Sequence, residues 1–292
     1  MTKAAFIGLG VMGFPMAGHL AAAGLDVCVY NRNGAKADTW LATHQGSKAE
    51  SPRDAAAGAD FVFTCVGNDD DLRAVVLGES GALAGMKSDA VLIDNTTTSA
   101  EVARELAAAC EAQGCALLDA PVSGGEAGAV NGALTVMVGG DEAAYAKAEP
   151  VMAHYARATK LMGPSGAGQL TKMVNQICIS GLVQALSEAL LFAEKAGLDG
   201  RAVVETISKG AAQSWQMENR YETMVDNQFD FGFAVDWMLK DLGIVLDEAA
   251  RNGAPLPVTQ LVKSYYEDVQ KAGGGRWDTS SLIARLRGFE NT

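Results

Sequence analysis

The chain has 292 residues, enough for about two domains with cores of their own. Its 23 Lys and Arg against 35 Asp and Glu give a formal net charge of −12, which argues against nucleic acid and anionic membranes as partners. With 49% hydrophobic and 20% charged residues, the composition excludes a disordered chain. The 33 glycines are an excess, which indicates places where the backbone comes close to a neighbour or a ligand.

The cysteines and histidines suggest neither a disulfide framework nor a metal site. The five cysteines are odd in number and form no CxxC pair, and the three histidines are scattered. The first residues enter an apolar strand at once, without room for a signal peptide, and no run of about 18 uninterrupted apolar residues predicts a membrane span. We expect a cytoplasmic protein with reduced thiols and no metal.

Strands and helices alternate in the first half of the chain. Short apolar runs predict buried strands, and the stretches between them predict helices, an order typical of a parallel sheet covered on both faces. We expect a doubly wound α/β domain over residues 1–163. The predicted strands are 4–8, 26–30, 61–66, 90–94, 116–119 and 133–139, and the predicted helices are 14–23, 100–113 and 142–155.

The second half of the chain predicts helices throughout. Residues 168–196 form one helical pattern of about 29 residues, ~43 Å long. The segments 201–209, 235–252 and 257–272 also read as helices. We expect an all-helical domain over residues 164–292 that begins with this long interdomain helix. The apolar face of the helix is wide enough to pack against a second subunit as well.

A glycine-rich turn stands between the first strand and the first helix. In this context the GxGxxG fingerprint predicts a Rossmann domain that binds a dinucleotide. Gly8 permits the tight turn, Gly10 lets the backbone approach a pyrophosphate, and Gly13 allows the helix to pack closely on the sheet. The helix N-terminus offers its N–H groups to the phosphates. The turn consists of Gly8, Leu9, Gly10, Val11, Met12 and Gly13.

The end of the second strand decides between the two nicotinamide dinucleotides. A site for NAD usually carries Asp or Glu there, which accepts a hydrogen bond from the ribose 2′-OH. This chain has Asn31 and Arg32, followed by Lys36. A carboxylate would repel a 2′-phosphate, whereas a guanidinium binds it through two charge-assisted hydrogen bonds. We predict a preference for NADP(H), with a solvated surface arginine as the alternative.

Two further segments carry candidate chemistry. Ser123, Gly124 and Gly125 follow a strand at the carboxyl edge of the sheet and expose backbone N–H groups suited to a carboxylate, although a plain loop fits the spacing equally well. Lys172 and Asn175 are three residues apart near the start of the long helix, so they share one face. Lys172 could exchange a proton with a carbonyl or hydroxyl oxygen, or it could be a solvated surface lysine.

Four segments in this order resemble the β-hydroxyacid dehydrogenases, the group around 3-hydroxyisobutyrate dehydrogenase and the tartronate, glyoxylate and succinic semialdehyde reductases. They are GLGVMGFPMAGHL, DAPVSGG, GPSGAGQLTKMVNQ and KDLGIVLDEA, and the resemblance covers essentially the whole chain. It implies a Rossmann domain followed by a helical domain that forms homodimers or homotetramers. It also implies hydride transfer between the nicotinamide and a short, carboxylate-bearing 3-hydroxy acid or its semialdehyde.

The resemblance also implies roles for residues matched by position. Lys172 matches the catalytic lysine, a general acid and base, and Ser123–Gly125 matches the loop that binds the substrate carboxylate. Many members have Asn-Asn at Asn175-Gln176, which leaves open which of the two contacts substrate. The matched cofactor contacts are Val66, which begins a Val-Gly-Asn segment where many members have Leu-Pro, the pair Thr96 and Thr97, and Lys240 near the nicotinamide.

Trp215 and Phe233 are the expected walls of the substrate pocket by the same resemblance, with core packing as the alternative. The substrate stays open between a 3-hydroxyisobutyrate-like acid and glyoxylate, tartronate semialdehyde or succinic semialdehyde, acted on mainly in the reductive direction. Two remoter functions are imine reduction and a non-catalytic NADP-binding module. Imine reductases usually carry a different acid at position 172, and a non-catalytic module has no need of Lys172, Ser123 and Asn175.

Overall fold

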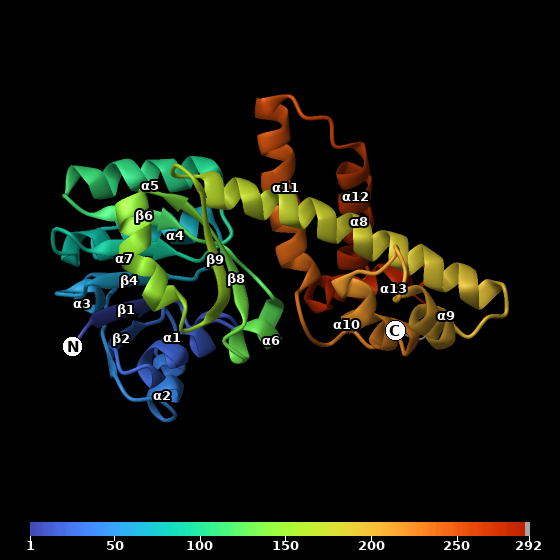
Figure 1. The fold of residues 1–292 in the computed structure, drawn as a ribbon, viewed down its shortest axis with the longest axis horizontal. Coiled ribbons are helices and arrows are strands. Elements are labelled where there is room, and N and C mark those ends of the chain that lie inside the picture. The colour runs from blue at the N-terminus through green and yellow to red at the C-terminus, as the bar shows by residue number, and fades with distance from the viewer. Residues whose placement is uncertain (290–292) are drawn as a thin grey trace. The chain divides into compact units, whose positions relative to one another are not determined.

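Figure 1 shows the computed structural model of the chain, which describes residues 1–289. The chain divides into two compact units, Met1–Lys172 and a second that begins at Met173. Every strand named among the described residues lies in the first unit, and the second is helical. The fold is therefore the predicted one, an α/β domain followed by an all-helical domain.

The first unit is built on one nine-stranded sheet. Its strands are β1 (Lys3–Ile7), β2 (Asp26–Tyr30), β3 (Ser47–Lys48), β4 (Phe61–Thr64), β5 (Val91–Asp94), β6 (Ala116–Asp119), β7 (Val122–Ser123), β8 (Leu134–Gly140) and β9 (Ala156–Gly163). Their order is β3-β2-β1-β4-β5-β6-β8-β7, with β9 beside β8. The strands from β1 to β6 are parallel, and β8 runs antiparallel to β6 and β7. The sheet is mostly parallel, as predicted, with antiparallel pairs that the sequence did not indicate.

Helices cover both faces of this sheet. They are α1 (Gly13–Ala22), α2 (Gly34–Leu41), α3 (Pro52–Ala56), α4 (Asp69–Leu77), η1 (Ala82–Gly85), α5 (Ala100–Ala112), α6 (Gly125–Val130) and α7 (Glu142–Met152). Alternate residues of β1 enter different cores, because successive strand side chains point to opposite faces. Phe6 packs in the core that contains Met16 of α1, and Ile7 in the core that contains Leu72 of α4. Burial on both faces explains why the central strands are apolar throughout.

The long helix α8 (Ala167–Lys195) begins in the first unit and continues in the second, within one residue of its predicted bounds. Among the described residues it alone is long and apolar enough, by length and composition, to cross a membrane. Val183, Leu186 and Leu190 of this helix are buried in the cores of the second unit. Their burial is that of a core helix in a globular protein.

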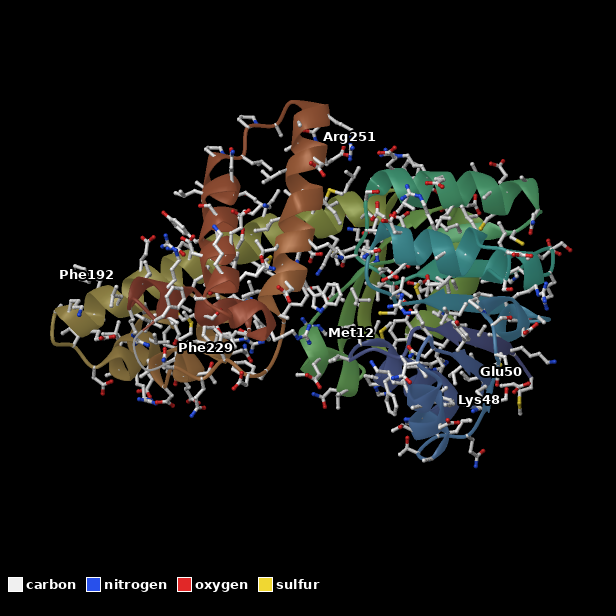
Figure 2. The ribbon with its side chains drawn as sticks, turned by 180° about the vertical axis from the view of Figure 1, so that it is seen from behind. Met12, Lys48, Glu50, Phe192, Phe229 and Arg251 are labelled. Carbon is white, nitrogen blue, oxygen red and sulfur yellow. The ribbon has the colours of Figure 1, made fainter. Side chains whose placement is uncertain are left out.

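The second unit packs its helices around two apolar cores. Its remaining helices are α9 (Gly200–Ile207), α10 (Trp215–Val225), α11 (Val235–Asn252), α12 (Pro257–Lys271), η2 (Gly274–Arg276), η3 (Thr279–Ser281) and α13 (Leu282–Leu286). Tyr266 of α12 is fully buried in one core, and Phe229 is buried in the other. Phe192 of α8 instead projects away from the helix and is 74% exposed (Figure 2).

Candidate active site

The glycine-rich turn has the geometry that its three glycines predict. Gly8 has a φ of +102°, and a Cβ there would collide with the backbone oxygen of Cys65. A Cβ on Gly13 would collide with the Gly8 oxygen and lie 2.9 Å from the Phe6 ring, so only glycine lets α1 approach β1 this closely. A Cβ on Gly10 would meet nothing within 4 Å. The space over Gly10 fits a group that approaches the backbone, as a pyrophosphate does.

A cavity of about 660 Å³ beside this turn brings together several of the predicted cofactor residues, Leu9, Gly10, Val11 and Lys36. Met12, which precedes α1, makes no side-chain hydrogen bond to the helix N-terminus, so the first N–H groups are not capped by a side chain. Together with the glycines, this arrangement fits a dinucleotide whose phosphates lie at the start of α1.

The three predicted cofactor residues that follow β2 in the sequence differ in their surroundings. The Asn31 side chain accepts a hydrogen bond from the backbone N–H of Leu9 (2.9 Å) and donates one to the oxygen of Asn33 (2.9 Å), so it shapes the glycine-rich turn itself. Arg32 is exposed, and its Nη1 lies 3.0 Å from the Asp71 carboxylate in a surface ion pair. Lys36 is exposed on α2. Surface ion pairs are weak, so Arg32 can exchange this partner for another anion.

The carboxyl ends of β4 and β5 bring Val66 and Thr96 together. The Val66 N–H donates to the Thr96 hydroxyl oxygen (3.1 Å). The buried Asp94 carboxylate accepts hydrogen bonds from the Thr64 hydroxyl (2.7 Å) and the Thr96 N–H (3.1 Å). Burial raises the pKa of Asp94 to about 7, although these hydrogen bonds favour the charged form. Thr97 follows directly and is half-buried.

The start of α8 is bonded to the sheet through Asp119, at the end of β6. Its carboxylate accepts the N–H of Gly166 (2.7 Å) on one oxygen and the N–H of Gln169 (2.9 Å) on the other. Burial raises the pKa of Asp119 to about 6, and the backbone hydrogen bonds oppose that rise. Sequence analysis missed this role, although Asp94 and Asp119 end adjacent strands and are paired in register.

The Gln169 side chain adds a second connection, and sequence analysis missed it too. Its Nε2 donates to the oxygen of Thr96 (2.7 Å), and its Oε1 accepts from the N–H of Thr98 (3.1 Å). Lys172 lies one helical turn beyond Gln169 and is buried, with 7% of its surface exposed. The predicted proton donor is therefore not a solvated surface lysine, and it lies on the helix turn next to Gln169, which is bonded to Thr96 and Thr98.

The predicted carboxylate loop lies between β7 and α6. Ser123 ends β7 and is half-buried. Gly124 and Gly125 have φ angles of +135° and +63°, a region that other residues rarely adopt. The two glycines therefore turn the chain sharply after Ser123 and keep backbone N–H groups unshielded by side chains.

In the second unit a chain of polar contacts connects α8 to α11. The Asn175 amide donates to Gln176 Oε1 (2.8 Å), and Gln176 Nε2 donates to Asp241 (2.6 Å). Lys240 Nζ lies 3.0 Å from the other Asp241 oxygen. Gln176 is buried and held from both sides, whereas Asn175 is half-buried.

The two expected wall residues of the second unit are not core residues. Trp215 is 46% exposed at the start of α10, and Phe233 is half-buried beside one of the apolar cores. Arg220, which the sequence analysis did not single out, lies over the Trp215 ring. Among residues 1–289 no group of three or more His, Cys, Asp or Glu side chains could hold a metal ion.

Two family profiles match the chain along almost its whole length. Residues 3–163 match the NAD-binding domain of 6-phosphogluconate dehydrogenase, and residues 166–286 match the NAD-binding domain of NADP-dependent 3-hydroxyisobutyrate dehydrogenase. The chain belongs to the β-hydroxyacid dehydrogenase family. This β-hydroxyacid dehydrogenase is thus an oxidoreductase that uses a nicotinamide dinucleotide, as the fingerprint predicted.

Similar proteins from three bacteria agree with this assignment. An uncharacterized oxidoreductase of Shewanella frigidimarina is 66% identical over 98% of each chain. The 2-(hydroxymethyl)glutarate dehydrogenase of Eubacterium barkeri is 35% identical, over 96% of this chain and 93% of its own. Among solved structures, 3-hydroxyisobutyrate dehydrogenase of Mycobacterium tuberculosis with L-serine has a TM-score of 0.89 at 33% identity, covering 98% of this chain and 99% of its own.

Proposed function

We propose that this β-hydroxyacid dehydrogenase transfers hydride between NADP(H) and a short 3-hydroxy acid or its semialdehyde, with Lys172 as the general acid and base. The observation that carries the proposal is the position of Lys172, which is buried one turn after Gln169, where Asp119 and Thr96 hold the helix start against the sheet. A general acid must be held at a fixed position to act on a reacting oxygen.

The bound nicotinamide supplies or accepts the hydride, and the side chains of the protein move the proton. In reduction, Lys172 Nζ donates a proton to the carbonyl oxygen of the substrate. In oxidation, the neutral amine accepts the hydroxyl proton. We assign the backbone N–H groups of Ser123–Gly125 to the substrate carboxylate, which would fix the reacting carbon and reduce the entropy lost in the reaction.

We assign cofactor and substrate contacts to further residues from their positions, hydrogen bonds and burial. Val66, Thr96 and Thr97 stand at the carboxyl ends of adjacent strands, where α/β folds bind cofactors, and Lys240 is assigned beside the nicotinamide. The side-chain amides of Asn175 and Gln176 are hydrogen-bonded to each other, and that of Gln176 is also bonded to Asp241. Of the two side chains, Gln176 is the buried one. We therefore assign the substrate contact to Asn175 and the holding role to Gln176.

The preference for NADP(H) rests on Arg32 and Lys36. Neither Asn31 nor Arg32 supplies the carboxylate that would bind a ribose 2′-OH and repel a 2′-phosphate. Arg32 is exposed and held by a weak surface pair with Asp71, so its guanidinium is accessible to a 2′-phosphate.

We also propose a cytoplasmic homodimer or homotetramer that assembles through the helical unit. The five cysteines are odd in number and form no CxxC pair, a pattern that fits a reducing compartment. Val174, Leu182 and Phe192 are exposed apolar residues along α8, a surface that a second copy would cover.

The test of the function is an assay of the full chain with short hydroxy acids and oxo acids, NADP(H) and NAD(H) in parallel. We expect turnover of a 3-hydroxy acid such as 3-hydroxyisobutyrate with NADP⁺, and we expect Lys172→Ala to bind NADPH normally without turnover. Normal turnover by Lys172→Ala would remove this residue from the mechanism.

A further inference from the structure

Arg220 of α10 holds its cation against two aromatic rings. Its guanidinium carbon lies 4.9 Å from the centre of the Trp215 ring and 5.2 Å from the centre of the Phe231 ring. The two rings are exposed to 46% and 36%, whereas the Arg220 side chain is 17% exposed. Aromatic rings over a guanidinium cover its faces, so new polar partners reach it at its edge.

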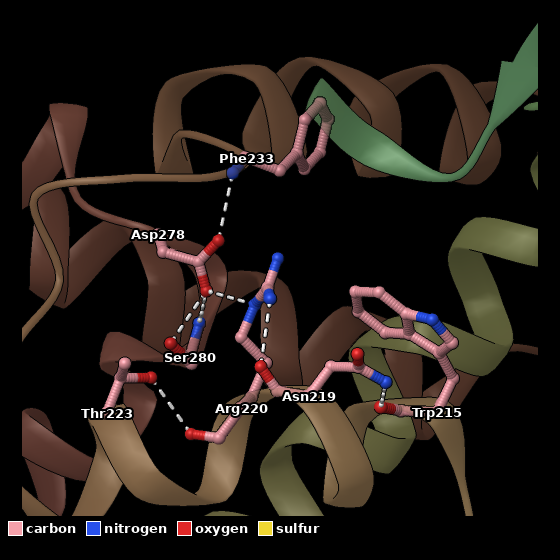
Figure 3. Close-up of polar contacts among 7 residues, drawn as sticks. All are labelled: Trp215, Asn219, Arg220, Thr223, Phe233, Asp278 and Ser280. Carbon is pink, nitrogen blue, oxygen red and sulfur yellow. Dashed lines mark hydrogen bonds and ion pairs between the residues drawn. The ribbon is translucent and has the colours of Figure 1, made fainter. Parts of the chain in front are cut away.

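The N–H groups at that edge are only partly occupied. Nε donates to the Asp278 carboxylate (3.2 Å), and Nη1 donates to the backbone oxygen of Asn219 (3.0 Å). Figure 3 shows the remaining nitrogen, Nη2, directed into the space between Trp215 and Phe233. The guanidinium is thus fixed at two of its three nitrogens and presents the third to the two residues expected to contact substrate.

Asp278 is fully buried, and Arg220 is not the only hydrogen-bond donor to its carboxylate. Its carboxylate also accepts the backbone N–H of Phe233 (2.9 Å), the N–H of Ser280 (3.0 Å) and the Ser280 hydroxyl (2.6 Å). Several donors therefore stabilise the negative charge of Asp278. Arg220 keeps positive charge and donor capacity for a second anion, and Asp278 serves to hold it in place.

We propose that Arg220 binds a second carboxylate of the substrate, so that the enzyme selects dicarboxylic hydroxy acids and semialdehydes. The inference rests on the proposed function and names its substrate class. Guanidinium groups bind carboxylates through directed hydrogen bonds, and a chain of net charge −12 needs a local cation to hold a doubly charged substrate.

A matched pair of substrates tests this selectivity. 2-(Hydroxymethyl)glutarate differs from 3-hydroxyisobutyrate by one carboxymethyl group in place of a methyl hydrogen, so the ratio of their kcat/KM values isolates the distal carboxylate. We expect the wild-type enzyme with NADP⁺ to favour the dicarboxylate. Arg220→Gln should lower the ratio about tenfold to a hundredfold, the range for losing a hydrogen bond to a charged group. Arg220→Lys keeps the positive charge but lacks the paired N–H groups of a guanidinium, so its ratio should lie between those of Arg220→Gln and wild type.

Arg285→Gln is the matched control. Arg285 also stacks on an aromatic ring, 3.9 Å from the centre of Tyr265, and also pairs with a carboxylate, that of Asp268 at 2.9 Å. It should leave the ratio unchanged. An Arg220→Gln ratio equal to that of wild type, or an equal fall in Arg285→Gln, overturns the proposal.

Binding measurements separate this inference from the proposed function. Calorimetry of the NADP⁺-loaded enzyme should show tighter binding of glutarate than of pentanoate, which replaces one carboxylate by a methyl group, and Arg220→Gln should abolish the difference. Turnover of neither hydroxy acid, with glutarate selectivity that depends on Arg220, refutes the proposed reaction but supports the carboxylate site. Turnover of 3-hydroxyisobutyrate without glutarate selectivity refutes the site alone. If Arg220→Gln does not fold, the wild-type glutarate preference and its reduction in Arg220→Lys support the proposal, and an unchanged preference in Arg220→Lys overturns it.

Discussion

Gly10→Ala should separate cofactor binding from protein stability in the glycine-rich turn. A Cβ at this position meets nothing within 4 Å, and the φ angle of Gly10 lies outside the left-handed region. The substitution is therefore compatible with the folded backbone. Replacing glycine by alanine at such a position stabilises a protein by about 0.4–1 kcal/mol, because the unfolded chain loses conformational freedom. We expect the cofactor-free variant to unfold at the same temperature as wild type or a few degrees higher.

The same methyl group should weaken cofactor binding. If the pyrophosphate approaches the backbone at Gly10, a Cβ occupies its place, and such overpacking costs about 1–3 kcal/mol. A loss near the low end is about tenfold in affinity. At a cofactor concentration of about 100 times the wild-type Kd, bound cofactor stabilises the wild type by about 2.7 kcal/mol and a tenfold weaker variant by about 1.4 kcal/mol.

Thermal unfolding with and without NADPH, and NADPH titration by fluorescence, measure both quantities. Gly13→Ala is the contrasting variant, because its Cβ collides with the Gly8 oxygen and should destabilise the protein even without cofactor. The reasoning is refuted if Gly10→Ala binds NADPH as tightly as wild type, or if it lowers the unfolding temperature of the cofactor-free protein.

Three further predictions concern the cofactor preference, the proton donor and a buried carboxyl. Arg32→Asp should weaken NADPH binding at least tenfold and NADH binding far less, because it replaces a cation by an anion; equal losses for both cofactors contradict the assignment. Lys172→Ala should lower kcat by about two to four orders of magnitude at unchanged NADPH affinity, measured by stopped-flow and titration. Asp94, with its pKa raised to about 7 from 3.8, holds a proton in the folded state that the unfolded chain releases above about pH 4. The free energy of unfolding should therefore fall as pH rises from about 4 to about 7, by up to about 4 kcal/mol from Asp94 alone, and urea unfolding of Asp94→Asn should keep only the smaller fall that is due to Asp119.

The elements that the sequence predicted well are those whose local pattern decides their structure. The strands predicted at 26–30 and 116–119 match β2 and β6 residue for residue, because each is a short run of mainly apolar residues. The edge strand β9 escaped prediction, since half of its residues are exposed and only the first, Ala156, is buried. Helix α10 escaped for a similar reason, because only three of its residues are buried: Gln216, Met217 and Met224.

In the candidate site, too, the sequence predicted the features that depend on neighbouring residues and missed those that depend on residues distant in sequence. The glycine-rich turn is contained in six consecutive residues, so its spacing was sufficient to predict a dinucleotide site. The roles of Asp119 and Gln169 depend on partners far away in sequence. Asp119 accepts N–H groups 47 and 50 positions later, and Gln169 bonds Thr96 across 73 positions. A single sequence carries no signal for such pairs beyond the placement of polar residues at strand ends.

Lys172, the proposed proton donor, is the last residue of the first unit and so belongs to the nucleotide-binding domain. Its position follows from a short series of bonds: Val66 to the Thr96 hydroxyl, the Thr96 oxygen to Gln169, and one helical turn to Lys172. Substitutions in the helical unit leave these bonds in place. The relatives that share this chain's length are named for different substrates, 2-(hydroxymethyl)glutarate and 3-hydroxyisobutyrate, at 35% and 33% identity. If the proposed roles hold, differences in substrate are to be sought in the second unit, at side chains such as Arg220, while the proposed proton donor Lys172 belongs to the first unit.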